Sequence, residues 1–174
     1  MSKINRRLIT YAIIIVSLFM LCSCSNSNLE NIVSKVDSDS SGYKSIDVTT
    51  KEKTAFADAS IIVIYENTTS GKQVFDVVSK NGRNGNVEMA ILIENNMVIN
   101  IAVISHQESE DHADRVFKDS YLNQYKNIDL TKKLLVSGGV PSSDNDIVVV
   151  SGATITSNAV LDCVNAVAFY LQNK

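Results

Sequence analysis

The chain has 174 residues, of which 45% are hydrophobic and 20% are charged, with a formal net charge of −3. This length suits one domain, and this apolar fraction is enough to build a core, which excludes a disordered polymer. One proline and three cysteines exclude proline-rich sequence and a disulfide scaffold, and the absence of a Cys-x-x-Cys pair argues against zinc. The chain has no basic patch, so nucleic acid is not expected as a partner.

The N-terminus is predicted to be an export signal. Three basic residues precede an apolar run over residues 8–21, which is short for a membrane span and typical of a signal peptide. The run ends in Leu21-Cys22-Ser23-Cys24, which resembles the lipobox of bacterial lipoproteins. We expect a lipoprotein signal peptide over 1–23, lipidation at Cys24 and a location on the extracytoplasmic face of the cell membrane. The alternatives are an uncleaved anchor and an ordinary secretory signal.

Residues 24–50 are predicted to be the lipidated cysteine and a flexible tether. The stretch 25–41 is rich in serine, asparagine and aspartate, a composition typical of linkers. The folded part is expected to begin near Gly42 or Lys51, and we assign residues 51–174 to one domain.

The first half of this domain reads as strands, after a short helix expected over 54–60. Two strand-like runs flank Asn95-Asn96, which predicts a tight hairpin because asparagine tolerates positive φ. Short links between successive strands predict an antiparallel meander. The strands are expected over residues 61–65, 73–79, 87–94 and 97–105.

The second half reads mainly as helices. Residues 111–125 place their apolar side chains near one face, and short apolar runs follow at 134–136 and 147–150. Apolar residues over 160–171 follow the 3.6-residue period, and Ser157 is a candidate N-cap for this last helix. The predicted fold class is therefore α+β, an antiparallel β-sheet meander with packed helices.

The most informative motif is Ser151-Gly152-Ala153-Thr154-Ile155-Thr156-Ser157, between an apolar run and the last helix. Small residues let a ligand approach the backbone closely. The N-terminus of a helix offers N–H groups and a partial positive charge, which together favour a phosphate. The motif therefore predicts an anion site, although it lacks the Gly-Lys pair of a Walker A loop.

This motif resembles the flavinylation motif of the FMN-binding domain family. That family includes the C subunit of sodium-pumping NADH:quinone reductase and the G subunit of the Rnf complex. The resemblance implies that a flavin transferase joins the FMN phosphate to Thr154 as a phosphodiester. It also implies that Ser151, Gly152 and Ala153 line the cofactor, while Thr156 and Ser157 donate to the phosphate or cap the helix.

A second similarity lies upstream, in His106-Gln107-Glu108-Ser109, which resembles a His-x-Glu-Thr segment of the family. Glu108 is expected either to contact the flavin or its ribityl chain, or to be an exposed loop acid. Two positions depart from the family pattern. Val148 stands where an aspartate is usual, and an acidic segment over 110–113 replaces a loop rich in proline and glycine.

The resulting hypothesis is an exported FMN lipoprotein that relays electrons outside the cytoplasmic membrane. No nicotinamide fingerprint and no base–nucleophile constellation are present, so we assign no catalytic and no metal-binding side chain. Electrons are expected from a redox partner protein or a quinol-linked donor. The alternatives are a flavin-free surface binding or assembly lipoprotein of the same fold, and a flavin-dependent extracellular reductase.

Overall fold

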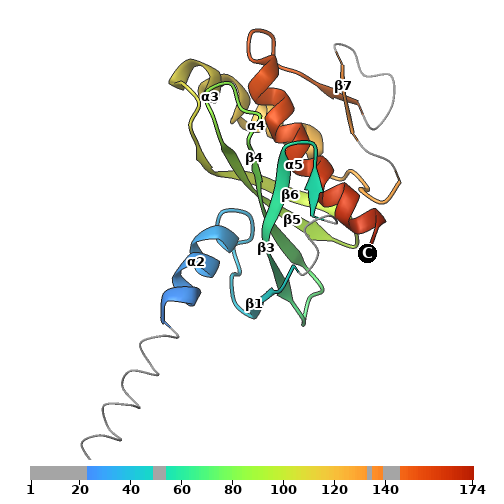
Figure 1. Ribbon diagram of the computed structural model, residues 1–174. Helices are drawn as coiled ribbons and strands as arrows, with labels where there is room; N and C mark the ends of the chain where they lie inside the picture. The colour runs from blue at the N-terminus through green and yellow to red at the C-terminus, as the bar shows by residue number, and fades with distance from the viewer. Residues whose placement is uncertain (1–22, 49–53, 133–134, 139–145) are drawn as a thin grey trace, which may run out of the picture.

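The structure is a computed structural model that describes residues 23–48, 54–132, 135–138 and 146–174. Nearly all of the predicted signal peptide lies outside these residues. Within the described part, no helix is long and apolar enough to cross a membrane. A six-stranded sheet forms the centre of the fold, with helix α5 on one face and helix α2 on the other (Figure 1).

The sheet has the order β1-β3-β4-β5-β6, and β2 pairs with β3 at one end. Every pairing in it is antiparallel, which confirms the predicted meander. The strands are β1 (Tyr43–Ile46), β2 (Ala55–Phe56), β3 (Ala59–Asn67), β4 (Gln73–Ser79), β5 (Val87–Glu94) and β6 (Met97–His106).

Two turns in this sheet test the sequence predictions. Asn95 and Asn96 have φ angles of 52° and 62°, so the predicted hairpin between β5 and β6 is confirmed. The short helix expected over 54–60 is wrong. Ala57 has a φ of 51°, and this left-handed residue turns the chain so that β2 pairs back onto β3.

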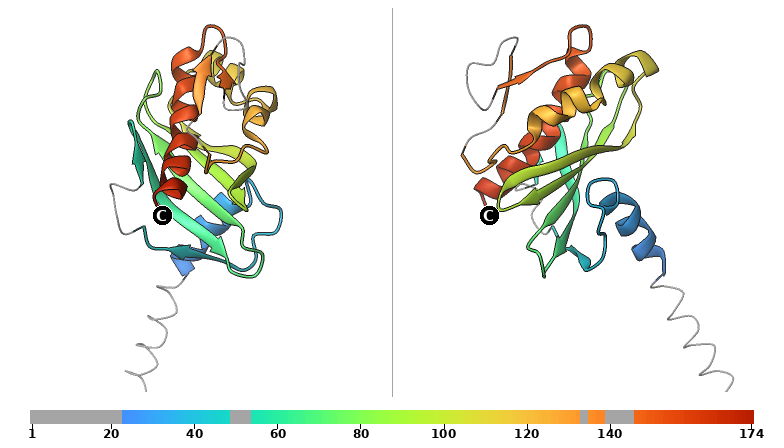
Figure 2. Two further views of the ribbon diagram at one scale, coloured as in Figure 1. Left: turned by 90° about the vertical axis from the view of Figure 1, so that its right-hand side faces the viewer. Right: turned by 180° about the vertical axis from the view of Figure 1, so that it is seen from behind.

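The central strands are buried on both faces, which explains their nearly continuous apolar sequence. Phe75 and Met89 are fully buried on the side of α5 (Thr154–Gln172), where the larger core lies. Val74 and Leu92 point to the opposite face and belong to a second apolar cluster under α2 (Ser23–Val33). The two views in Figure 2 show α2 and α5 on opposite sides of the sheet.

Helix α2 corrects the expectation of a flexible tether over residues 24–50. Ile32, Val33 and Val36 are buried against the sheet, and Asn100 Nδ2 donates a hydrogen bond of 3.0 Å to the carbonyl oxygen of Val36. Together with Leu29 they follow the helical i, i+3, i+4, i+7 spacing. Because most other residues of this stretch are polar, the sequence predicts a linker here and not a helix.

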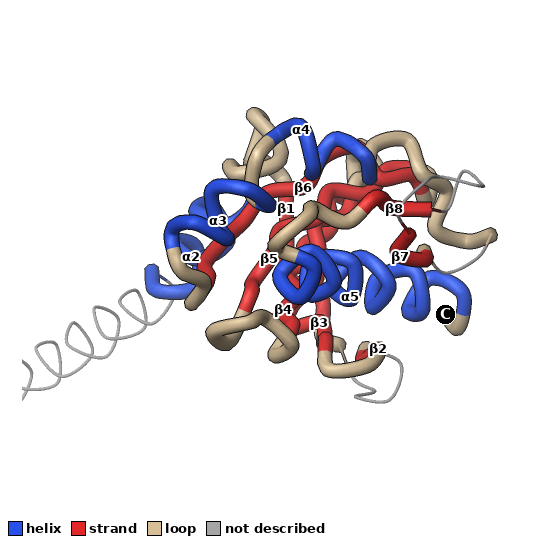
Figure 3. The backbone as a smooth tube through the Cα atoms, turned by 90° about the horizontal axis from the view of Figure 1, so that it is seen from above, coloured by secondary structure: helices blue, strands red, loops and turns tan. Residues whose placement is uncertain are grey.

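The chain between β6 and α5 is less regular than predicted. The single helix expected over 111–125 is broken into α3 (Glu110–Val116), α4 (Asp119–Leu122) and the 3₁₀ turn η2 (Asn123–Tyr125), because Lys118 is extended. Strands β7 (Val136–Gly138) and β8 (Asp146–Val148) pair in parallel and form a separate small sheet (Figure 3).

Candidate functional site

The candidate site lies at the start of α5, where the chain leaves β8. The helix begins at Thr154 with Ala153 at the N-cap, so the predicted N-cap at Ser157 is wrong. Ser151, Gly152 and Thr154 are exposed in this turn. Gly152 has a φ of 79°, and a Cβ there would lie 3.1 Å from Arg115 Nη1. The left-handed backbone conformation therefore favours glycine at this position, and its neighbour is the tip of the Arg115 side chain.

The three hydroxyl groups of the motif lie in different surroundings. Thr156 is fully buried, and its Oγ1 donates a hydrogen bond of 2.7 Å to Glu108 Oε2. Ser157 is also fully buried; its Oγ donates to the carbonyl oxygen of Ala153 at 3.0 Å and accepts from the backbone N–H of Val150 at 3.1 Å. Both hydroxyl groups are thus used in hydrogen bonds within the protein. Thr154 carries the exposed hydroxyl of the three.

Glu108 lies directly behind the motif and is only 7% exposed. While one carboxylate oxygen accepts from Thr156, the other accepts from the backbone N–H of Asn84 at 3.3 Å. A Cβ on Gly82 would overlap both Glu108 Oε1 and the carbonyl oxygen of Gly85. Glu108 therefore braces the loop before β5 against the first turn of α5. The expectation of an exposed loop acid is therefore wrong, whereas the contact of Glu108 with the flavin or its ribityl chain stays a prediction.

A cavity of about 260 Å³ opens beside the exposed hydroxyl. It is lined by residues 152–156 together with Arg83 and His112. His112 Nδ1 lies 2.7 Å from Ser109 Oγ. The guanidinium of Arg83 near a helix N-terminus makes a cationic surrounding suited to an anion, and the His112 imidazole adds a hydrogen-bonding group.

The residues present fit the phosphate end of a flavin mononucleotide. Gly152 adds no side chain of its own in front of the helix, where the 19-residue α5 directs its N-terminal N–H groups and where Arg115 Nη1 also lies. Thr154 supplies an exposed oxygen at the same point, within the cavity lined by Arg83.

Several residues that support the site could not be found from the sequence. Gln124 bonds both backbone groups of Val148, at 3.0 Å to its N–H and 3.2 Å to its carbonyl oxygen. Tyr121 donates a hydrogen bond of 2.9 Å to the carbonyl oxygen of Ser157, and burial raises the pKa of Tyr121 to about 12, so it stays protonated. These bonds join segments far apart in the chain and have no local sequence signature.

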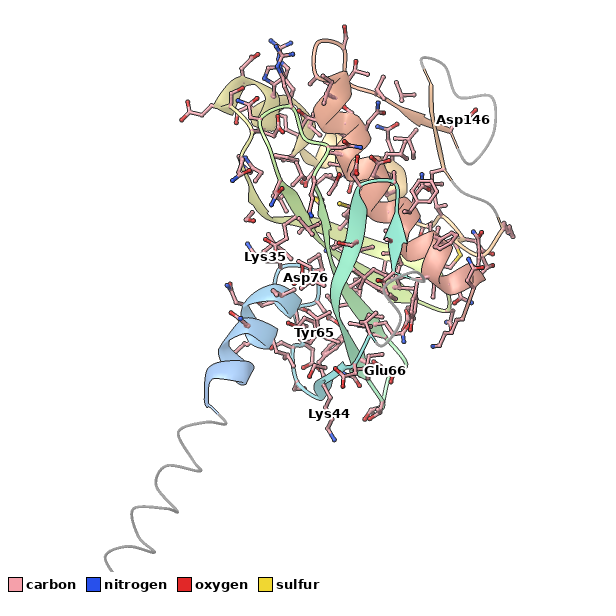
Figure 4. The ribbon with its side chains drawn as sticks, viewed as in Figure 1. Lys35, Lys44, Tyr65, Glu66, Asp76 and Asp146 are labelled. Carbon is pink, nitrogen blue, oxygen red and sulfur yellow. The ribbon has the colours of Figure 1, made fainter. Side chains whose placement is uncertain are left out.

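Another buried ionisable group lies away from the site. Asp76 is 3% exposed on the α2 side of β4, and Figure 4 shows it with Tyr65 beside α2. Burial, and secondarily the carboxylate of Glu88, raises the pKa of Asp76 to about 7. Because the sheet separates Asp76 from α5, we do not assign it to the candidate site.

Comparisons with known proteins agree with this geometry. The sequence profile of the FMN-binding domain family matches residues 82–168, which is half of the chain. The crystal structure of Shewanella oneidensis NqrC superposes with a TM-score of 0.56 over 84% of this chain and 96% of that chain. The two sequences are 17% identical, so this likeness shows the fold alone. A search among curated proteins found no match.

Proposed function

Since the chain belongs to the FMN-binding domain family, we propose that it is an exported lipoprotein that holds one FMN on Thr154 and relays electrons outside the cytoplasmic membrane. The observation that carries the proposal is the exposed Thr154 hydroxyl at the start of α5, in a cavity that Arg83 and His112 also line. Bound FMN supplies the redox chemistry, and the protein supplies attachment, orientation and electrostatics.

In this proposal the linkage is a phosphodiester between Thr154 Oγ1 and the FMN phosphate, made by a flavin transferase. The N–H groups of the first turn of α5 and the guanidinium of Arg83 offset the phosphate charge. The hydrogen bonds of Glu108 to Thr156 and to the N–H of Asn84 fix the position of the loop before β5 relative to the start of α5. Covalent attachment suits an exported protein, because an FMN that dissociated outside the cell would be lost by dilution.

The location is proposed from the N-terminal sequence. The apolar run over 8–21 and the lipobox-like residues before Cys24 favour export and a lipid anchor on the extracytoplasmic face of the cell membrane. The electron donor or acceptor would be a redox partner or a quinol-linked protein.

Intact mass under denaturing conditions tests the proposal. The full chain, produced in a host that exports it and supplies a flavin transferase, should gain the mass of FMN minus one water. Thr154→Ala should remove this gain, whereas Thr69→Ala, which removes an exposed threonine hydroxyl in the turn between β3 and β4, should keep it. A yellow protein without the gain would contradict the covalent bond. A colourless protein would contradict the electron-carrier function.

A further inference from the structure

We infer that the flavin end of this domain points away from the membrane, so that its electron partner is an extracytoplasmic redox protein and not a quinol dissolved in the bilayer. The inference rests on the proposed function for two positions, the flavin at Thr154 and the anchor at Cys24. The evidence from the structure is the way in which α2 is fastened to the sheet.

Helix α2 is held by both packing and polar contacts. Val33 is fully buried, and Ile32 is 8% exposed. Directly after the helix, Asp37 accepts a hydrogen bond of 2.8 Å from the hydroxyl of Tyr43 and forms an ion pair of 3.0 Å with Lys72. Swinging α2 away from the sheet would expose the apolar side chains and break these contacts. The orientation of the domain relative to α2 is therefore set by the fold.

The apolar cluster under α2 extends from one end of the central strands to their middle, and the candidate site lies at their other end. Val74, near the first residue of β4, belongs to the apolar cluster under α2. Gly82, which contacts the brace at Glu108, follows the last residue of the same strand. Seven strand residues span roughly 20 Å at about 3.3 Å per residue.

The anchor lies still farther in the direction away from the site. Cys24 is eight residues before Ile32 within α2, a rise of about 12 Å along a helix. Figures 1 and 2 show the N-terminal half of α2 projecting from the domain at the end opposite to the start of α5. A membrane at Cys24 would thus face one end of the domain, and Thr154 would face the other.

This arrangement decides which partner can reach the flavin. Electron exchange needs close approach of two redox groups, and a quinol confined to the bilayer lies at the anchored end of the domain, whereas the start of α5 lies at the other end. The far end also carries an apolar contact for a protein. Ile155 is 51% exposed beside Thr154, and in the described part of the chain only Ile62 is an equally exposed large hydrophobic side chain.

The experiment compares two oxidants of the reduced, flavin-loaded full chain bound to phospholipid vesicles. Ferricyanide is water-soluble, and two ions of it take the two electrons while the protons pass to water. A long-chain quinone confined to the bilayer takes both electrons and two protons and becomes the quinol. We expect ferricyanide to oxidise the vesicle-bound protein as fast as it oxidises detergent-solubilised protein. We expect the quinone to oxidise the vesicle-bound protein at least ten times more slowly than it oxidises variants whose domain can reorient relative to the anchor.

Two variants provide that freely oriented domain. A Gly/Ser spacer of about 15 residues inserted between Cys24 and Asn28 leaves the core intact and should raise the quinone rate at least ten-fold. Val33→Asp should release α2 and do the same, whereas Ser34→Asp, at an exposed neighbouring position, should not. Flavin absorbance and thermal melting check that each variant remains folded and loaded.

The outcomes separate the inference from the proposed function. Rapid oxidation of the unmodified protein by the bilayer quinone, or no gain from the spacer, would overturn the inference while leaving the flavin in place. Failure to associate with vesicles would overturn it by removing the anchor. A chain without flavin would instead contradict the proposed function.

Discussion

The hydroxyl of Thr156 donates a 2.7 Å hydrogen bond to the carboxylate of Glu108, 48 residues earlier in the chain. Both side chains are buried, so the bond is made in a surrounding where an unpaired polar group is costly. It connects the end of β6 to the first turn of α5. The second carboxylate oxygen extends the connection to Asn84. The position of the proposed flavin attachment point, Thr154, thus depends on a side chain that lies beneath it.

Replacing Glu108 should destabilise the protein through this brace. Glu108→Ala leaves the hydroxyl of Thr156 and the N–H of Asn84 without their acceptor, so the free energy of unfolding should fall by about 1–3 kcal/mol. Glu108→Gln keeps one carbonyl oxygen for Thr156 and should cost less. Urea denaturation measures both, with Glu110→Ala on exposed α3 as the control. Equal stability of the Glu108→Ala and Glu110→Ala variants would contradict the bracing role.

Substitution of Gly82 should disturb the same brace by steric overlap. The added Cβ in Gly82→Ala meets backbone and the carboxylate of Glu108 at once, so the loop must shift, at a cost of about 1–3 kcal/mol. Gly71→Ala is the matched control: no atom lies within 4 Å of its Cβ, and only its φ of 75° is unfavourable. Thermal melting should therefore show a larger loss for Gly82→Ala, accompanied by a lower yield of flavin attachment. A larger loss of thermal stability for Gly71→Ala than for Gly82→Ala would show that the loop accommodates a Cβ at position 82.

Asp76 should make stability decrease as the pH rises. Its pKa of about 7 in the folded chain lies above the ordinary value of 3.8, so the folded protein binds the extra proton between these two pH values. The favourable contribution is complete below about pH 4 and is lost as the pH rises to about 7. A rise of this size corresponds to about 4 kcal/mol as an order of magnitude.

Asp76→Asn tests this pH dependence, because the amide cannot ionise. The difference in free energy of unfolding between the variant and the natural protein should grow in favour of the variant from pH 4 to pH 7 and stay constant above it. Asn31→Ser, an exposed substitution that changes no ionisable group, should give a flat difference. A flat difference for Asp76→Asn as well would mean that the buried carboxyl group is ionised throughout this range.

Removal of the Asp37 carboxylate should loosen α2 without unfolding the domain. Asp37→Ala breaks the bonds to Tyr43 and Lys72, so hydrogen exchange in residues 28–48 should become faster while exchange in β4 and β5 stays slow. Asp39→Ala is the control, because the Asp39 carboxylate accepts its hydrogen bonds from Ser41, two residues away, and the backbone N–H that donates to Asp37 is kept. If the two variants exchange at the same rate, Asp37 does not hold the helix.

The sequence alone determined the features that depend on neighbours in the chain. The β5–β6 hairpin follows from two strand-like apolar runs and from Asn95-Asn96, which accept the left-handed conformation that the turn requires. The last helix follows from its apolar period. The exposed Thr154 and the helix start belong to one continuous heptapeptide, so the candidate site was visible as a motif and in its resemblance to a family.

Only the tertiary structure decided the features that depend on distant partners. A serine- and asparagine-rich segment became α2 because the sheet offers an apolar face to Ile32 and Val33. Glu108 is a buried brace because it follows the end of β6, which lies next to Thr156 in the folded chain. In each case the local sequence is compatible with more than one conformation. The free energy that selects one comes from burial and hydrogen bonds with residues whose position in space no local pattern encodes.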